Sequence, residues 1–210
     1  MARGISPKQL YSKKFKTFEF DGIWKDILGS PERGGYWLIY GDEKNGKSTF
    51  ALILAKYLSL LEKVAYISAE EGTGHSFQNR CKRIGITEEH KFLAYDYNLW
   101  EDLLETFKGR EFAKIIFIDN LTAYDDEISK KMILQLTKDY PKTLFIIIAH
   151  EDRKEPVGAV GKLVKKLAKR IVRVIGLKAL VTNRDGSGGE YIINDKKALV
   201  YHGVTQNTTS

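Results

Sequence analysis

The chain alternates short apolar runs with longer segments in which apolar residues return every three or four positions. Runs of the first kind, rich in β-branched residues, are typical of strands, and the second pattern is typical of helices. The predicted strands span residues 36–40, 64–68, 92–95, 115–119 and 144–149, and the predicted helices span residues 48–61, 75–84, 99–108 and 128–140. Nearly continuous apolar strands indicate a sheet covered by helices on both faces. The expected fold class is therefore α/β, with a mostly parallel central sheet flanked by helices.

The pattern changes after residue 150. Four short apolar runs follow a basic stretch, at residues 171–175, 178–182, 190–193 and 198–201. Glycines, together with Asn and Asp, separate these runs and are turn signals. We therefore expect C-terminal β-hairpins that extend the sheet.

The N-terminal residues differ from the rest of the chain, because lysines are mixed with Tyr11, Phe15, Phe18, Phe20 and Trp24. We expect this segment to precede the core and to cover its edge; alternatively, it meets the bases of a nucleic acid or packs on an adjacent subunit. No internal repeat or long linker divides the chain. The expected organisation is a basic, aromatic segment at residues 1–33, a core domain at residues 34–204 and a flexible tail at residues 205–210.

A phosphate-binding motif follows the first predicted strand. Residues 41–48 read Gly-Asp-Glu-Lys-Asn-Gly-Lys-Ser and match the Walker A pattern G-x-x-x-x-G-K-[ST], with a predicted helix directly after them. Backbone N–H groups and the helix N-terminus would surround the phosphates, Lys47 would reach the outer phosphates, and the Ser48 hydroxyl would take Mg²⁺. We therefore predict ATP and Mg²⁺ as ligands. The residues expected to contact the nucleotide are Gly41, Asp42, Glu43, Lys44, Asn45, Gly46, Lys47, Ser48 and Thr49.

Three residues of this loop are unusual. Asp42, Glu43 and Lys44 occupy positions where such loops usually have small or apolar residues. Two carboxylates beside a polyphosphate would repel it. Either Lys44 neutralises them in part, or both carboxylates point to solvent.

Two acidic residues stand at the ends of predicted strands. Asp119 closes the run 115–119 and is expected to hold Mg²⁺ through water, as a Walker B residue; alternatively, it caps a helix. Glu70 follows the run 64–68, where a carboxylate can orient and polarise the water that attacks the terminal phosphate. The alternative for Glu70 and its neighbour Glu71 is that both cap the helix that follows.

The order of these motifs resembles that of RecA-like ATPases. The matching stretches are residues 41–48, Ser68-Ala69-Glu70, residues 116–119 and residues 183–190, and together they span about residues 34–201. Within this group they look most like the core of DnaB-type replicative helicases. The resemblance implies a RecA-like fold, ATP hydrolysis, single-stranded DNA as a partner and assembly of the chain into a ring or filament.

The resemblance also implies roles for individual residues. Glu70 matches the family's catalytic glutamate, and Arg184 matches an arginine finger that serves the ATP of a neighbouring subunit. The lysine that stands two places before this finger in the family is replaced by Thr182. His150 ends the strand after Asp119, where the family has a polar sensor of the terminal phosphate; alternatively, it is a hydrogen-bonded histidine at a strand end.

A set of lysines follows His150 at helical spacing. Lys162, Lys165, Lys166 and Lys169 recur at i, i+3, i+4 and i+7, so a helix would gather them on one face. The 34 Lys plus Arg residues against 27 Asp plus Glu residues give a formal net charge of +7, which also favours a polyanionic partner. We expect this face to bind single-stranded DNA, and the alternative is an ordinary solvated helix face.

The resulting hypothesis is an oligomeric, DNA-dependent ATPase that acts in replication, recombination or repair. Two alternatives remain open: a non-catalytic, ATP-gated accessory or loader module, and a small-molecule or nucleotide kinase. A kinase usually carries an arginine-rich lid, and none is evident between Asp119 and His150. The chain has one cysteine, and no stretch approaches the roughly 20 apolar residues of a membrane span. We therefore expect a cytoplasmic protein that does not associate with a membrane.

Overall fold

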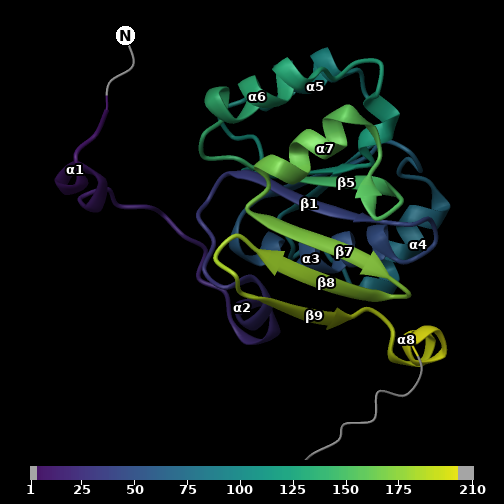
Figure 1. Ribbon diagram of the computed structural model, residues 1–210. Helices are drawn as coiled ribbons and strands as arrows, with labels where there is room; N and C mark the ends of the chain where they lie inside the picture. Colours follow the sequence, from purple (N-terminus) through teal and green to yellow (C-terminus); the bar gives the residue numbers. More distant parts are fainter. Residues whose placement is uncertain (1–3, 203–210) are drawn as a thin grey trace, which may run out of the picture.

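The computed structural model describes residues 4–202, and its centre is a nine-stranded sheet (Figure 1). Eight strands follow the order β3-β2-β4-β5-β1-β7-β8-β9, and β6 pairs with β5 beside this path. The strands are β1 (Gly35–Gly41), β2 (Val64–Ser68), β3 (Phe92–Tyr95), β4 (Ile115–Asp119), β5 (Leu144–Asp152), β6 (Glu155–Pro156), β7 (Arg170–Ile175), β8 (Lys178–Asn183) and β9 (Gly188–Ile192).

The larger part of the sheet is parallel. Strands β3, β2, β4, β5, β1 and β7 all run in one direction, and β8 and β9 continue the sheet as antiparallel hairpins. β1 lies in the middle, where Trp37 is opposite Ile146 of β5 and Arg170 of β7. The carboxyl ends of the parallel strands therefore share one edge of the sheet, and their amino ends share the other.

Helices cover both faces of the parallel part (Figure 1). Helices α2, α3 and α4 pack on one face, and α5, α6 and α7 pack on the other. The helices are α1 (Pro7–Tyr11), α2 (Gly22–Leu28), α3 (Lys47–Leu61), α4 (His75–Ile84), α5 (Trp100–Phe107), the 3₁₀ helix η1 (Leu121–Tyr124), α6 (Lys130–Asp139), α7 (Gly158–Leu167) and α8 (Asp195–His202).

Each face of the sheet has its own apolar core. Trp37 and Ile39 of β1 point into the core beneath α3, whereas Leu38 and Tyr40 point into the core beneath α6. The alternation follows from the two-residue period of a strand. Because both faces are buried, polar side chains can reach solvent only at the two edges where strands begin and end.

The structure confirms the α/β fold class, the mostly parallel sheet and the antiparallel hairpins. One predicted strand is wrong, because residues 198–201 belong to helix α8. The Oδ1 atom of Asn194 accepts a hydrogen bond from the backbone N–H of Lys197 at 3.1 Å, and the Asn194 carbonyl accepts one from Ala198 at 2.8 Å. The Asn-Asp pair interpreted as a turn signal therefore starts a helix, which is the ordinary role of an N-cap Asn.

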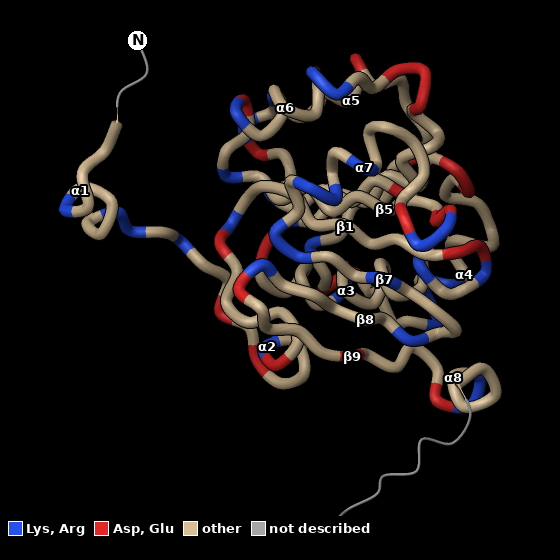
Figure 2. The backbone as a smooth tube through the Cα atoms, viewed as in Figure 1, with Lys and Arg blue, Asp and Glu red and all other residues tan. Residues whose placement is uncertain are grey.

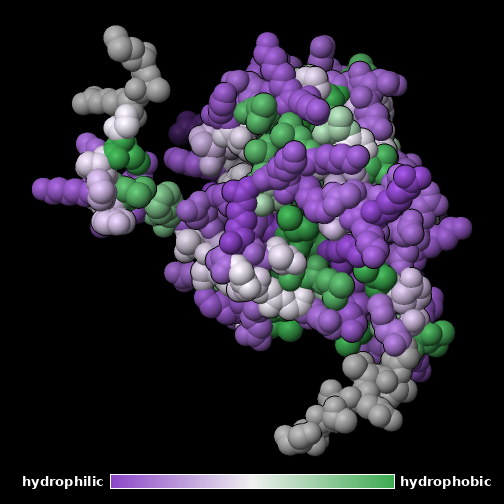
Figure 3. Space-filling model, in the orientation of Figure 1, coloured by the Kyte–Doolittle hydropathy of each residue, from purple (hydrophilic) through white to green (hydrophobic). Residues whose placement is uncertain are grey.

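Part of the N-terminal segment belongs to the core, contrary to expectation. Phe18, Phe20 and Trp24 are 2%, 7% and 8% exposed and pack into the core beneath α3. Residues 4–16, here named the N-terminal arm, differ: Tyr11 and Phe15 are 83% and 60% exposed, and the arm stands away from the body of the molecule (Figure 3). The boundary at residue 33 stays a prediction, and the tail at residues 205–210 lies outside the described residues.

Replacing Trp24 by Ala is expected to lower the free energy of unfolding by about 3–5 kcal/mol, the usual cost of removing a large buried aromatic side chain. The Trp24 ring stacks on Tyr57 and Tyr191 with centroid separations of 5.3 and 5.1 Å. Tyr11→Ala is the matched control, since its ring is exposed, and should leave the melting temperature unchanged. Equal melting temperatures for the two variants in thermal denaturation would place Trp24 outside the cooperative core.

Candidate nucleotide-binding site

The predicted phosphate loop connects the end of β1 to the start of α3. Gly46 has φ 99° in the left-handed region, and a Cβ atom there would lie 2.6 Å from Cδ2 of Leu177. A Cβ atom on Gly41 would lie 2.2 Å from the carbonyl oxygen of Val174. Glycine is therefore required at both ends of the loop: at Gly46 by the backbone conformation, and at Gly41 by the close approach of β7.

Lys47 is the first residue of α3 and is 7% exposed. Its Nζ atom donates to the carbonyl oxygen of Asp42 at 2.7 Å, so the ammonium group lies inside the loop. Burial lowers the pKa of Lys47, and the nearby carboxylates, Asp119 foremost, act in the opposite direction. A phosphate would supply the charge that this partly desolvated cation lacks in the free protein.

Asp119 ends β4 as a buried carboxylate. It accepts a hydrogen bond from the Tyr66 hydroxyl at 2.6 Å. Burial raises the pKa of Asp119, although the hydroxyls of Tyr66 and Ser48 act to lower it. Asp119 and Ser48 together offer oxygen donors beside the phosphate loop, which is the donor type that Mg²⁺ prefers when it also binds phosphates.

Glu70 and Glu71 point to different partners. Glu71 forms a bidentate ion pair with Arg80 of α4, with N–O distances of 2.7 and 3.0 Å. Glu70 accepts a hydrogen bond from the Asn120 side chain, and its carboxylate lies 3.4 Å from Nε2 of His150. Neither glutamate caps α4, whose N-cap is Gly74 without a side-chain hydrogen bond.

Asn120 is a site residue that the sequence analysis missed. Its Oδ1 atom accepts hydrogen bonds from the backbone and hydroxyl of Thr122, which fixes the orientation of the amide. Its Nδ2 atom then faces Glu70 on one side and Nε2 of His150, at 2.6 Å, on the other. The sequence could have indicated Asn120 as a site residue, because it directly follows Asp119 at the end of a buried strand. The peptide bond between Asp119 and Asn120 is cis.

These residues surround one cavity of about 430 Å³ at the carboxyl edge of the sheet. It brings together most of the predicted nucleotide, metal and catalytic residues from the loop, β2, β4 and β5. Asp42 and Asn45 instead line a neighbouring cavity of about 480 Å³, and Asp42, Glu43 and Lys44 are all exposed. The lining residues are Glu43, Lys44, Gly46, Lys47, Ser48, Thr49, Glu70, Glu71, Arg80, Asp119, Asn120, His150 and Leu177.

Arg184 lies at the opposite edge of the sheet. It follows β8, where Asn183 pairs with Arg170, and Arg170 pairs with Trp37 near the start of β1. The four residue steps from Trp37 to Gly41 correspond to about 13 Å of strand. The structure therefore does not bring Arg184 to the phosphate loop of its own chain; instead, its guanidinium group donates to the carbonyl oxygen of Lys166.

The predicted lysine face is only partly formed. Helix α7 ends at residue 167, so Lys169 lies beyond it and pairs with Glu32 at 2.6 Å. Lys165 pairs with Glu155 at 2.8 Å. The lysines of this set that stay exposed are Lys162 and Lys166.

Within residues 4–202, no group of three or more His, Cys, Asp or Glu side chains is arranged to hold a metal ion. Over the same residues, no helix has the length and apolar character needed to cross a membrane.

Asp119→Asn is not expected to lower stability at neutral pH. Burial raises the folded-state pKa of Asp119, so ionisation of this carboxyl opposes folding above the usual aspartate range of about 4. The amide removes that charge and still accepts from Tyr66. Thermal melts without nucleotide should show a melting temperature at least equal to that of the wild type at neutral pH. The difference should vanish below about pH 4, and a lower melting temperature at neutral pH would contradict the prediction.

Comparison with known proteins gives relatives of low sequence identity. No family model matches the chain. The DNA repair protein RadA of Aquifex aeolicus (strain VF5) is 24% identical over 196 residues, and the match covers 85% of this chain but 44% of RadA. The chain thus spans less than half the length of this relative.

Solved structures share the fold. The flagellar accessory protein FlaH from Methanocaldococcus jannaschii has a TM-score of 0.60 at 19% identity, covering 81% of this chain and 88% of FlaH. A KaiC-like protein from Pyrococcus horikoshii OT3 has a TM-score of 0.58 at 17% identity, covering 85% and 94%. The RadB recombinase has a TM-score of 0.53 at 19% identity, covering 82% and 94%. These comparisons do not show the expected likeness to DnaB-type helicases; the chain shares the α/β fold of the three solved structures, and in sequence it is similar to RadA.

Proposed function

We propose that this protein binds ATP with Mg²⁺, hydrolyses it, and acts on DNA in recombination or repair. The observation that carries the proposal is the convergence of Lys47, Ser48, Asp119 and Glu70 on one cavity at the carboxyl edge of the sheet. In parallel α/β sheets this edge is where ligands bind. The relatives add support, because RadA is a DNA repair protein and RadB a recombinase.

The phosphate loop would bind and orient the nucleotide. The backbone N–H groups at the start of α3 point toward the phosphates, and the positive end of the helix dipole favours their charge. Lys47 would exchange the Asp42 carbonyl for an outer phosphate oxygen. Ser48 and Asp119 would hold Mg²⁺, whose contribution when bound is to neutralise negative charge on the phosphates.

Glu70 would orient and polarise the attacking water. It lines the cavity and has no ion pair with Arg80, which is paired with Glu71. Asn120 holds Glu70 through its amide and also faces His150, so it acts as a positioning residue for both. His150, near the end of β5, would sense the terminal phosphate.

DNA would be bound through cations that have no acidic partner. Lys162 and Lys166 of α7 are exposed and fit such contacts better than Lys165 and Lys169, whose charges are paired within the chain. Contacts of lysine with phosphate do not depend on the base sequence of the DNA. They therefore suit a protein that acts on any DNA strand.

Assembly would complete the site. Arg184 lies at the amino edge of the sheet, about one strand length from its own phosphate loop, so it would have to serve the ATP of a neighbouring subunit. An arginine finger supplied in this way can contribute a factor of about 10³–10⁵ to the rate. We therefore propose a homo-oligomer, a ring or filament, in which the carboxyl edge of one subunit faces the amino edge of the next.

Glu70→Gln is expected to retain ATP binding and to lose turnover by about 10²–10⁴-fold, the usual contribution of a general base. Glu71→Gln is the matched control, since it makes the same change at the adjacent residue that pairs with Arg80, and should stay within a few-fold of the wild type. Binding is measured with a fluorescent ATP analogue and turnover by phosphate release, with Lys47→Ala as the variant that loses both.

Two results would change this assignment. Loss of turnover in Glu71→Gln with normal turnover in Glu70→Gln would move the catalytic role to Glu71. ATP binding by the wild type without hydrolysis, with or without single-stranded DNA, would favour an ATP-gated accessory module.

The contribution of Arg184 in trans is tested by mixing two inactive variants. Arg184→Ala keeps an intact phosphate loop, and Lys47→Ala keeps an intact Arg184, so a mixed interface can contain one complete site. We expect each variant alone to be inactive and the mixture to recover part of the wild-type activity. An inactive mixture whose two components demonstrably co-assemble would show that Arg184 is not a finger.

A further inference from the structure

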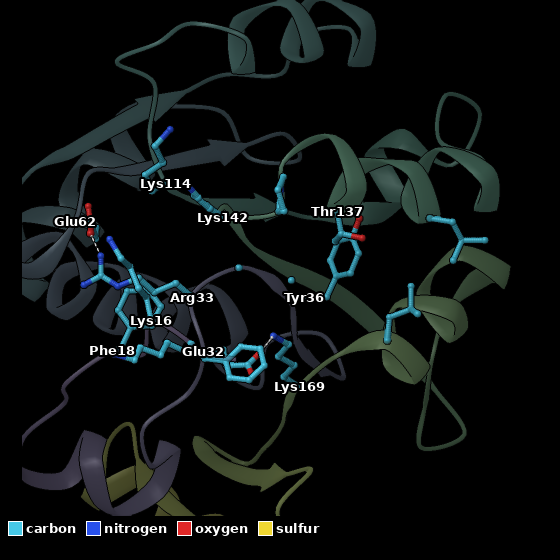
Figure 4. Close-up of a pocket in the computed structure, with 17 residues that line it drawn as sticks. Lys16, Phe18, Glu32, Arg33, Tyr36, Glu62, Lys114, Thr137, Lys142 and Lys169 are labelled. Carbon is cyan, nitrogen blue, oxygen red and sulfur yellow. Dashed lines mark hydrogen bonds and ion pairs between the residues drawn. The ribbon is translucent and has the colours of Figure 1, made fainter. Parts of the chain in front are cut away.

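A large cavity lies at the amino edge of the sheet, away from the nucleotide site (Figure 4). It has a volume of about 800 Å³ and is bounded by the end of the N-terminal arm, the segment that leads into β1, the turn between α6 and β5, and the end of α7. Gly35 of its wall pairs with Leu144, the first residue of β5, which fixes its place at the amino ends of the strands. It is therefore separate from the cleft beside Lys47.

The cavity has an excess of positive charge. Six cationic side chains and two carboxylates line it. Glu32 pairs with Lys169, and Glu62 pairs with Arg33, so both carboxylates are neutralised within the wall. Four lysines then remain without an ion-pair partner among residues 4–202: Lys14, Lys16, Lys114 and Lys142.

Helix dipoles explain only part of this excess. Helices α3, α6 and α7 end at this edge, and each C-terminus carries roughly half a negative charge, which nearby lysines would offset. Three such ends account for fewer than two of the four lysines. The remaining charge is available for an anionic ligand.

The cavity also offers an open aromatic surface. Phe15 is 60% exposed, and its ring stacks on no other aromatic ring of the described chain. Phe18, by contrast, is buried, with the Arg33 guanidinium 5.1 Å from its ring centroid. Lys14 and Lys16 flank Phe15 in the sequence, so one exposed ring stands between two cations.

Cationic groups continue beyond the cavity. The backbone N–H of Arg184 donates to the carbonyl oxygen of Lys169 at 3.3 Å, and its side chain reaches the carbonyl of Lys166. In the segment that joins α1 to the body of the molecule, Lys13 adds a further cation next to Lys14 of the cavity (Figure 2). The positive track is thus longer than a single nucleotide.

We propose that this cavity binds single-stranded DNA, with phosphates along Lys16, Lys114 and Lys142 and a base stacked on Phe15. Lysines that follow a backbone together with an exposed aromatic ring are the combination that binds single strands without regard to sequence. This strand site rests on the proposed function only in that both require the protein to bind DNA. It does not depend on ATP hydrolysis or on the lysines of α7.

The test measures binding of a short fluorescent oligothymidylate by anisotropy, without nucleotide and over a range of salt concentrations. Phe15→Ala should weaken binding about tenfold, as expected for one lost base stack, and Phe15→Trp should bind like the wild type. Lys114→Ala combined with Lys142→Ala should reduce the slope of log affinity against log salt by about 1.4, or about 0.7 for each lost phosphate contact.

Matched controls separate the cavity from general charge and from the rest of the arm. Tyr11→Ala removes an exposed aromatic ring of the arm that does not line the cavity. Lys82→Ala combined with Lys91→Ala removes two exposed lysines elsewhere, with the same change in net charge. Both controls should match the wild type in affinity and salt slope.

The outcomes distinguish this inference from the proposed function. If the wild type binds the strand but the cavity variants behave like their controls, the inference is wrong and the DNA path over α7 stands. If the wild type binds no single-stranded DNA, both fail. If thymidine monophosphate competes as well as the oligothymidylate at equal phosphate concentration, the cavity binds a small phosphate ligand. The proposal of a single-strand site is then wrong.

Discussion

The parallel register of β2, β4, β5 and β1 is the constraint on which the nucleotide site depends. Ser68 pairs with Asp119 across β2 and β4, and Gly41 pairs with His150 across β1 and β5. Strands β2 and β4 are buried along their whole length, so chemistry becomes possible only where they end. A slip of one residue in any pair would turn the side chains of that strand to the other face and take an acid or the imidazole out of the cavity.

The two edges of the sheet differ in chemistry because they are made of opposite strand and helix ends. The carboxyl edge has the N-terminus of α3 and the carboxylates of Asp119 and Glu70, which suit a nucleotide with its metal ion. The amino edge has helix C-termini, unpaired lysines and Arg184. In an assembly where these edges meet, the nucleotide of one subunit would lie beside Arg184 of the next. The proposed finger and the proposed strand site both follow from this polarity of the fold.

The candidate site contains charges that the core does not favour. Burial acts against the charged forms of both Lys47 and Asp119, since it lowers the pKa of the first and raises that of the second. Such groups are unfavourable to the free protein and become favourable when a ligand of opposite charge joins them. The surrounding strands, which are almost wholly apolar, supply the stability that makes this arrangement possible.

The sequence by itself determined the strands and helices between residues 36 and 149, the phosphate loop and the acidic strand ends, because these depend on local periodicity and on residues adjacent in the chain. It misjudged residues 198–201, where a short apolar run is compatible with either a strand or a helix and the capping bond of Asn194 decides. It gave no sign that Trp24 is core or that Asn120 joins Glu70 to His150. Tertiary structure alone decided the places of Trp24 and Asn120 and the pairing of Lys165 and Lys169 with acids, since each requires contact between segments that the sequence keeps apart.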